Sequence, residues 1–241
     1  LTIVMTKSAD VPAAVTGGQS TVALRAPAHP VARALLAAFG RGIAAPSANR
    51  YGRISPTRAA DVHEELGDRV ALVLDGGDCE VGLESTIVAC LDGPVTLLRP
   101  GAVSRSQLAD LVGPIADADA ASPRAPGRDR SHYAPYTALA VIEAGGLRAE
   151  IERALASGER IAVLARSEAP VVSERLVWRV LDQRPMEYGR ALYAALRELD
   201  RAGAARILVE DVPSGEPWAA ITDRLKRATA PGADGAVTDA T

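Results

Sequence analysis

Polar side chains occur in this sequence where short apolar runs begin or end, and such positions are where an α/β sheet binds its ligands. They are Arg25, Ser47, Asn49, Ser55, Thr57, Glu84, Ser85 and Arg99. Two arginines with several hydroxyl and amide groups suit an anionic ligand rich in hydroxyl groups, such as a nucleotide together with an amino acid. The helix start expected at Ser55–Thr57 adds a natural position for an anion.

The same residues also have structural interpretations. The serine, threonine and asparagine side chains could cap a helix or form a turn. The arginines could be surface charges, and Glu84 could form an ion pair with Arg99. No single residue decides between these interpretations and ligand binding.

Several other chemistries are disfavoured by the sequence. It contains no G-x-G-x-x-G motif, which disfavours a dinucleotide-binding fold, and no G-x-x-x-x-G-K-[ST] motif, which disfavours a Walker-type NTPase. It also contains no G-x-S-x-G motif, which disfavours acyl hydrolysis. The three histidines are scattered, and Cys79 and Cys90 form no C-x-x-C, so we expect no zinc site and two reduced, at least partly buried thiols. A formal net charge of −3 and an aromatic content of 3% give no indication of tight nucleic-acid binding, which needs positive charge and rings for base stacking.

Hydrophobic periodicity predicts the elements that would position these residues. In the N-terminal half we expect strands over 1–5, 21–25, 43–45, 70–74, 86–90 and 95–99, the last two as a hairpin. Helices are expected over 29–39, 57–66 and 104–112. The third should begin with a capping box, because Gln107 stands three residues after Ser104.

Strand and helix patterns alternate regularly in the C-terminal half. Strands are expected over 139–143, 160–165, 176–181 and 206–210, and helices over 146–156, 186–202 and 218–227. Such alternation is typical of a largely parallel sheet with helices on its faces. The Ala, Asp, Pro and Gly-rich stretch between the halves predicts a linker, so we divide the chain into a domain over 1–112, a linker or lid over 113–138, a second domain over 139–228 and a disordered tail over 229–241.

Four segments of the N-terminal half together resemble the YrdC-like threonylcarbamoyl-AMP synthase family. They are TVALRAPAHP (21–30), APSANRYGRISPT (45–57), VGLESTIV (81–88) and LLRPGAVS (97–104). APGRDRSHYAP (125–135) resembles the linker of the long form of the family, and YGRALYAALRELD (188–200) and PWAAITDRLKRA (217–228) resemble its second domain. The resemblance implies a YrdC-like twisted open α/β sheet domain joined by a linker to a smaller Rossmann-like α/β domain.

The resemblance also implies an activity and its site. Members of the family are nucleotidyltransferases that join L-threonine, bicarbonate and ATP into threonylcarbamoyl-AMP and pyrophosphate, and Mg²⁺ is expected on the phosphates. The nucleotide-binding positions it implies are Thr21, Ser47, Asn49, Ser55, Arg99, His132 and Tyr133. The threonine-binding positions it implies are Arg25, Ala45 and Ser85. No side-chain nucleophile and no metal-ligating side chain are implied.

The implied product is used to form N6-threonylcarbamoyladenosine at position 37 of tRNA. A separate tRNA threonylcarbamoyl transferase would take up that product, so contact with tRNA itself is expected to be weak or indirect. The expected location is the cytoplasm, with no membrane association, since no apolar run reaches the length of a membrane span.

The sequence departs from the family at its start. Relatives carry a further N-terminal segment with an early threonine and a K-x-R motif, whereas this sequence opens at Leu1 in a strand-like run. We therefore expect an N-terminally incomplete first domain, which leaves the activity of this chain by itself open. The alternatives are an inert nucleotide- or tRNA-binding module of the same fold, and a YrdC-like domain for another carbamoyl transfer, as in hydrogenase maturation. The second is disfavoured because the cysteine clusters and acylphosphatase segment of that group are absent.

Overall fold

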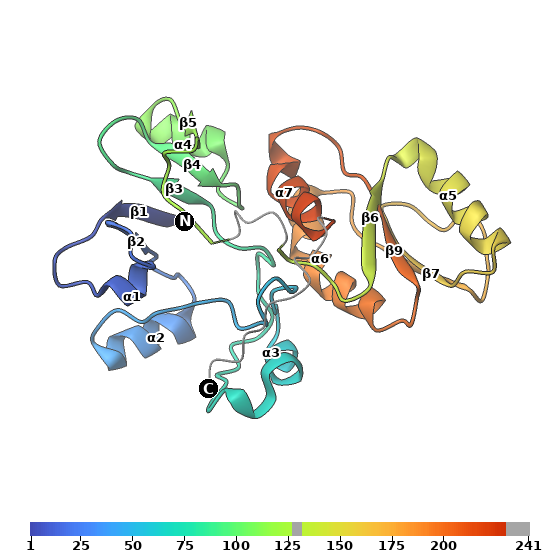
Figure 1. The fold of residues 1–241 in the computed structure, drawn as a ribbon, viewed down its shortest axis with the longest axis horizontal. Helices are drawn as coiled ribbons and strands as arrows, with labels where there is room; N and C mark the ends of the chain where they lie inside the picture. The colour runs from blue at the N-terminus through green and yellow to red at the C-terminus, as the bar shows by residue number, and fades with distance from the viewer. Residues whose placement is uncertain (127–131, 230–241) are drawn as a thin grey trace.

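Two β-sheets organise the chain, one from each half of the sequence (Figure 1). The computed structural model describes residues 1–126 and 132–229. Residues 127–131 of the predicted linker and 230–241 of the predicted tail lie outside the described residues. Within the described part of the chain, no helix has the length and apolar character needed to cross a membrane.

The N-terminal half forms a mixed sheet with short helices. Its strands are β1 (Thr2–Thr6), β2 (Thr21–Leu24), β3 (Ile87–Ala89), β4 (Thr96–Arg99) and β5 (Ala116–Asp117). Its helices are α1 (Ala13–Thr16), α2 (Pro30–Phe39), α3 (Ala59–Leu66) with the 3-10 turn η1 (Gly67–Arg69), and α4 (Arg105–Val112). The strand order is β2-β1-β3-β4-β5, with β1 parallel to β3 and β4 parallel to β5.

Local sequence signals predicted several of these elements. The antiparallel pair β3–β4 confirms the predicted hairpin. The capping box of α4 is also confirmed, because the Gln107 backbone N–H donates to Ser104 Oγ at 3.1 Å and the Ser104 N–H donates to Gln107 Oε1 at 2.9 Å. Both motifs depend on residues close in sequence, which is why the sequence alone specifies them.

Two predicted strands, 43–45 and 70–74, are wrong. Both segments are irregular, and Leu72 and Leu74 are 73% and 52% exposed. A strand needs a neighbour for its backbone N–H and C=O groups, and none of the described segments pairs with either stretch. Conversely, β5 lies inside the predicted linker, where it pairs with the first two residues of β4. The apolar pattern therefore indicated strand character without indicating a partner.

The C-terminal half confirms the predicted alternation of strands and helices. Its elements are β6 (Ala138–Ile142), α5 (Ala144–Ala156), β7 (Ile161–Ala165), β8 (Leu176–Val180), α6 (Pro185–Asp200), β9 (Arg206–Glu210), the 3-10 turn η2 (Glu216–Trp218) and α7 (Ala219–Ala228). The strand order is β6-β9-β7-β8, and every neighbouring pair is parallel. The sheet is therefore parallel throughout, as the alternation predicts.

Helices cover both faces of this second sheet. Ile161 and Val163 pack with Ile151 of α5, whereas Leu164 packs with Leu192 and Leu196 of α6 on the other face. This division follows from the period of two along a strand, and a strand buried on both faces is apolar throughout. Figure 1 shows α6 and α7 on the side nearer the N-terminal half and α5 on the far side.

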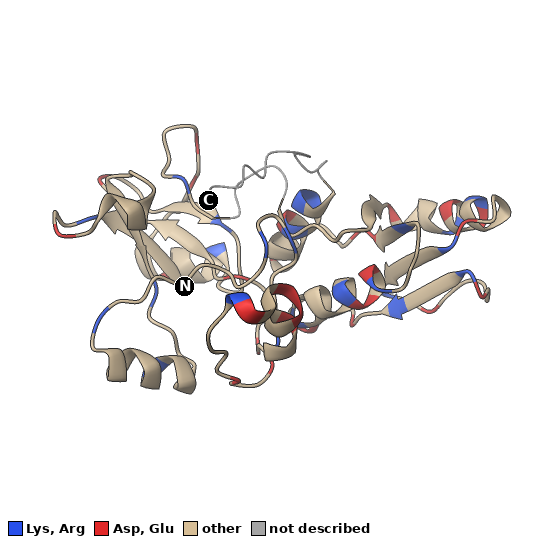
Figure 2. Cartoon of the chain, turned by 60° about the horizontal axis from the view of Figure 1, so that its bottom comes forward, with Lys and Arg blue, Asp and Glu red and all other residues tan. Residues whose placement is uncertain are grey.

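The two halves share an apolar and charged junction. Ile54 of the N-terminal half and Tyr133 of the linker belong to the same buried cluster as α6 and α7. Arg197 of α6 forms an ion pair with Glu65 of α3 at 3.0 Å, and both side chains are less than 10% exposed. In Figure 2, both signs of charge are interspersed along the C-terminal half. Apolar packing and specific ion pairs, of which Arg197–Glu65 is buried, therefore join the halves.

Candidate functional site

Three of the predicted site residues lie at one edge of the first sheet. Arg25 directly follows Leu24, which pairs with Ile3, while Ser85 stands two residues before Ile87, which pairs with Thr2. Arg99, the last residue of β4, pairs with that same Ile87. The strand register therefore brings Arg25, Ser85 and Arg99 to the same end of β2, β3 and β4, with β1 between β2 and β3, as expected for a ligand site.

Arg99 is buried and uses its guanidinium to hold backbone. Its Nε and Nη2 donate to the Ser85 carbonyl at 3.1 and 3.0 Å, and its Nη1 donates to the Pro126 carbonyl in the linker at 3.0 Å. Burial lowers the pKa of Arg99, and the neighbouring phenol of Tyr133 opposes that change. Arg99 is thus no surface charge, whereas Arg25 is exposed.

Glu84 forms an ion pair, but with Arg224 of α7 rather than with Arg99. Arg224 Nε donates to Glu84 Oε2 at 2.9 Å, and Tyr193 of α6 donates to the same oxygen at 3.0 Å. The Ser55 hydroxyl donates to Glu84 Oε1 at 2.6 Å. Ser55 therefore binds this carboxylate and is not the N-cap of α3, which is Arg58. Burial alone would raise the pKa of Glu84, but the Arg224 charge and the Ser55 hydroxyl outweigh it and hold the pKa below its ordinary value.

The predicted linker residues His132 and Tyr133 lie against this cluster. The Tyr133 ring is 1% exposed, stacks on Tyr193 with 5.8 Å between centroids and has the Arg224 guanidinium 5.4 Å from its centre. The His132 ring meets the Tyr133 ring edge-on at 4.3 Å. Tyr133 has φ of +64°, which a bulky residue seldom adopts and which marks strain held by its surroundings. Burial and the Glu84 carboxylate raise the pKa of its phenol.

The remaining predicted residues lie apart from this cluster. Thr21 pairs with Thr6 at the other end of β2, and Ala45 and Ser47 are exposed in the irregular segment before α3. Asn49 donates to the carbonyl oxygens of Arg50 and Arg53 at 2.7 and 3.2 Å, which is the behaviour of a turn former. Within the described residues, no hydrogen bond or ion pair joins any of these four to Ser85, Arg99 or Glu84.

Sequence reasoning missed three residues of this arrangement. Thr2 Oγ1 lies 2.6 Å from Ser85 Oγ, although the two are 83 positions apart. Tyr193 and Arg224 reach Glu84 across 109 and 140 positions. Motif spacing carries no signal for such pairs, because the tertiary fold alone brings them together.

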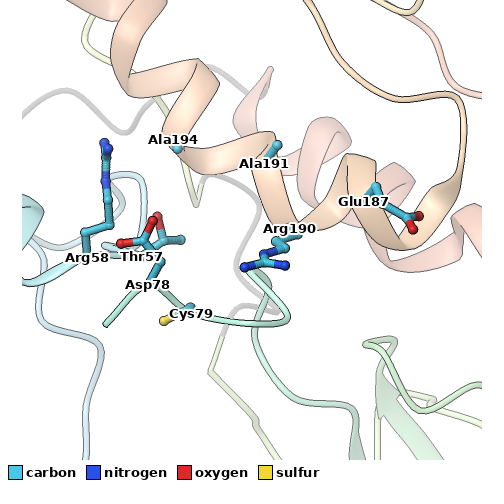
Figure 3. A pocket seen from close by; sticks show the side chains of 8 residues that line it. All are labelled: Thr57, Arg58, Asp78, Cys79, Glu187, Arg190, Ala191 and Ala194. Atoms are coloured by element: carbon cyan, nitrogen blue, oxygen red, sulfur yellow. The ribbon is translucent and has the colours of Figure 1, made fainter. Parts of the chain in front are cut away.

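A separate hollow of about 260 Å³ lies between the start of α3 and α6. Figure 3 shows Arg190 extending from α6 toward Cys79, with Thr57 and Asp78 between Cys79 and Arg58. The cysteines are not buried as expected, since Cys79 and Cys90 are both exposed, one in an irregular loop and one just after β3. Of the candidate binding residues only Thr57 lines the hollow. Its backbone N–H donates to Asp61 Oδ2 at 3.0 Å, so we do not assign the hollow to the site.

A side-chain metal centre finds no support in the described residues. Among them, no three His, Cys, Asp or Glu side chains gather in a way that could hold an ion. Arg25 and Arg99 instead place guanidinium groups at the sheet edge, and such groups suit carboxylate and phosphate oxygens. The arrangement thus offers cations and hydroxyl groups to an anionic ligand.

Comparison with known proteins gives two family matches. Residues 1–101 match the Sua5, YciO and YrdC family model, whose description is "Telomere recombination". Residues 103–230 match the model of the threonylcarbamoyl-AMP synthase C-terminal domain. The two matches together run through nearly all of the described residues.

Individual relatives and solved structures agree with these matches. The chain is 39% identical to threonylcarbamoyl-AMP synthase of Bacillus subtilis over 89% of this chain and 64% of the relative, and 34% identical to that of Pyrococcus abyssi over 95% and 70%. It superposes on the crystal structure of P. abyssi Sua5 complexed with L-threonine with a TM-score of 0.83 and 33% identity, over 95% of this chain and 69% of that one. A doubly substituted P. abyssi Sua5, with a His and a Tyr changed to Ala, gives 0.81. The chain thus spans about two thirds of the length of these relatives.

Proposed function

The chain belongs to the threonylcarbamoyl-AMP synthase family, in the form with a second C-terminal domain, and we propose that the protein containing it is a nucleotidyltransferase that makes threonylcarbamoyl-AMP. Its substrates would be L-threonine, bicarbonate and ATP, and its second product pyrophosphate. The observation that carries the proposal is the gathering of Arg25, Ser85 and Arg99 at one sheet edge. A relative of the same fold was solved with L-threonine bound.

The proposed chemistry needs positioning more than a protein nucleophile. The threonine amine condenses with bicarbonate to a carbamate and releases water. A carbamate oxygen then attacks the α-phosphorus of ATP, and the bond to the β-phosphate oxygen breaks so that pyrophosphate leaves. Both reactants are anions, so cations that offset their repulsion and geometry that aligns them supply most of the catalysis.

Named residues have proposed roles in this scheme. We assign the threonine carboxylate to Arg25 and Ser85, and we keep Ala45 as the third threonine-binding position. The nucleotide would contact Thr21, Ser47, Asn49, Ser55 and Arg99. His132 and Tyr133 would close the site from the linker and exclude water, which protects both the carbamate and the mixed anhydride. An adjacent His and Tyr were also replaced by Ala in the P. abyssi variant, so we select His132 and Tyr133 for substitution.

We place Mg²⁺ with the substrate rather than with the protein. The described residues include no cluster of metal-binding side chains, and Mg²⁺ in phosphoryl-transfer sites is commonly held through the substrate phosphates and water. It would enter as MgATP and neutralise charge on the phosphates. We further propose that the chain divides into a first domain over 1–112, a linker or lid over 113–138 and a second domain over 139–228. We also propose that the protein is cytoplasmic and that its product passes to an enzyme that modifies adenosine 37 of tRNA.

The test measures pyrophosphate release by the complete protein containing this chain. Release should require ATP, L-threonine and bicarbonate together, and mass spectrometry should detect threonylcarbamoyl-AMP. Arg25→Ala should raise the KM for threonine by about tenfold or more, because a hydrogen bond to a charged group is worth about 1.5–3 kcal/mol. Arg33→Ala is a matched control, since Arg33 is also an exposed arginine of this half. Binding of ATP or tRNA without pyrophosphate release would support the inert binding module instead.

A further inference from the structure

Thr2 is fixed by the backbone and presents its hydroxyl to Ser85. It is 9% exposed, and its backbone N–H donates to the Thr86 carbonyl at 2.8 Å. The parallel register places it opposite Ile87. Its Oγ1 lies 2.6 Å from Ser85 Oγ, and within the described residues this is the one hydrogen bond that the Thr2 hydroxyl makes.

The Ser85 backbone is held on two further sides. Arg99 donates twice to its carbonyl, at 3.1 and 3.0 Å. Gly101 packs so closely that a methyl group there would overlap the Ser85 carbonyl carbon and the Thr86 nitrogen. With its backbone held in this way and its Oγ beside Thr2 Oγ1, Ser85 can still differ in the direction of its hydroxyl proton.

Neighbouring groups decide that direction. A hydroxyl carries one proton and two acceptor lone pairs. Arg99 Nη2 lies 3.5 Å from Ser85 Oγ, and its positive charge disfavours a proton on that side. Either hydroxyl could donate in the bond between Thr2 Oγ1 and Ser85 Oγ. When the Thr2 hydroxyl is the donor, the Ser85 proton is left for an acceptor other than Thr2.

We propose that Thr2 is a positioning residue that sets the Ser85 hydroxyl as a hydrogen-bond donor to the carboxylate of the amino-acid substrate. The inference rests on the proposed function, because it takes the ligand at Ser85 to be an α-amino acid. Thr2 would act through Ser85 without touching the substrate. Its loss should therefore weaken the amino acid and leave the nucleotide unaffected.

Two substitutions at Thr2 separate this role from packing. Thr2→Val keeps the branched shape and strand preference but removes the hydroxyl, whereas Thr2→Ser keeps the hydroxyl and removes a methyl group. In the complete protein, Thr2→Val should raise the KM for L-threonine and its calorimetric Kd by about threefold to tenfold, the usual worth of one hydrogen bond. The KM for ATP should stay within about twofold, and Thr2→Ser should retain the threonine affinity.

A double-mutant cycle tests the route through Ser85. In a Ser85→Ala background, Thr2→Val should have no further effect on threonine affinity, because its partner is gone. An equal loss in both backgrounds, an equal rise in the KM for ATP, or failure of Thr2→Ser to rescue would overturn the inference. Absence of threonine-dependent pyrophosphate release in the unmodified protein would overturn the proposed function instead, and calorimetry with L-threonine alone would still decide on Thr2.

Discussion

Removing the Arg224 guanidinium should destabilise the protein by about 3 kcal/mol, since removing one partner of a buried ion pair leaves an uncompensated charge. The Arg224 side chain is 1% exposed, and that of Glu84 is 17% exposed. Arg224→Met deletes the donors at 2.9 Å to both Glu84 Oε2 and the Pro100 carbonyl. We take the low end of the usual range, because Ser55 and Tyr193 still donate to the carboxylate.

The measurement is urea unfolding, followed by far-UV circular dichroism and by the fluorescence of Trp178 and Trp218. The unfolding free energy of Arg224→Met is compared with that of Arg201→Met. Arg201 also pairs across the junction, with Glu64, but these side chains are 47% and 52% exposed. An exposed pair contributes about 0–1 kcal/mol, so the control should change little.

A second comparison tests the physical reason. The double variant Glu84→Gln with Arg224→Met removes both charges of the Glu84–Arg224 pair, while Asp223, the other carboxylate paired with Arg224, keeps Arg227. Most of the lost stability should therefore return. The reasoning is refuted if Arg224→Met lies within about 1 kcal/mol of the unmodified protein, or if the double variant is as unstable as Arg224→Met alone.

Three further changes test neighbouring contacts. The pKa of Glu84 is held below its ordinary value of 4.5, so its contribution to stability is complete above that pH and is lost as the pH falls below it. The difference in unfolding free energy between the unmodified protein and Glu84→Gln should therefore shrink in acid. A difference that grows in acid would contradict the assignment. Tyr193→Phe removes one donor to Glu84 and should cost about 1 kcal/mol in urea unfolding, so an unchanged midpoint would count against the hydrogen bond. Gly82→Ala should open the junction to limited proteolysis, because a methyl group would overlap the Arg190 backbone and φ is +77°, whereas Gly145→Ala, with open space around it, should leave the digestion pattern unchanged.

Sequence patterns predicted those parts of the fold that depend on neighbouring residues. The capping box at Ser104 and the alternation that gives four parallel strands are of this kind. The segments 43–45 and 70–74 failed because an apolar run states a preference, while a strand exists only beside another strand. The pattern contained no information about the absence of that neighbour among the described residues.

The candidate site divides along the same line. Family motifs drew attention to Ser85 and Arg99, and the strand register places both at one sheet edge. The predicted ion-pair partner of Glu84, Arg99, was wrong. Arg99 was chosen because it is close in sequence, whereas the actual partner, Arg224, lies on α7, 140 positions away. The fold determines which arginine lies close enough to pair with a carboxylate. A single sequence does not show which of several distant arginines that will be.

The strand order of the second sheet has a consequence for synthesis of the chain. Of the strands in the described residues, β9 is made last, yet it lies between β6 and β7. The sheet cannot close until residues 206–210 have left the ribosome, and α7, which carries Arg224, follows still later. The nascent N-terminal half therefore contains Glu84 without its cation until residue 224 has been made. A premature stop before residue 206 would remove the middle of one sheet and the counter-charge of the other half together, leaving exposed strand edges of the kind that promote aggregation.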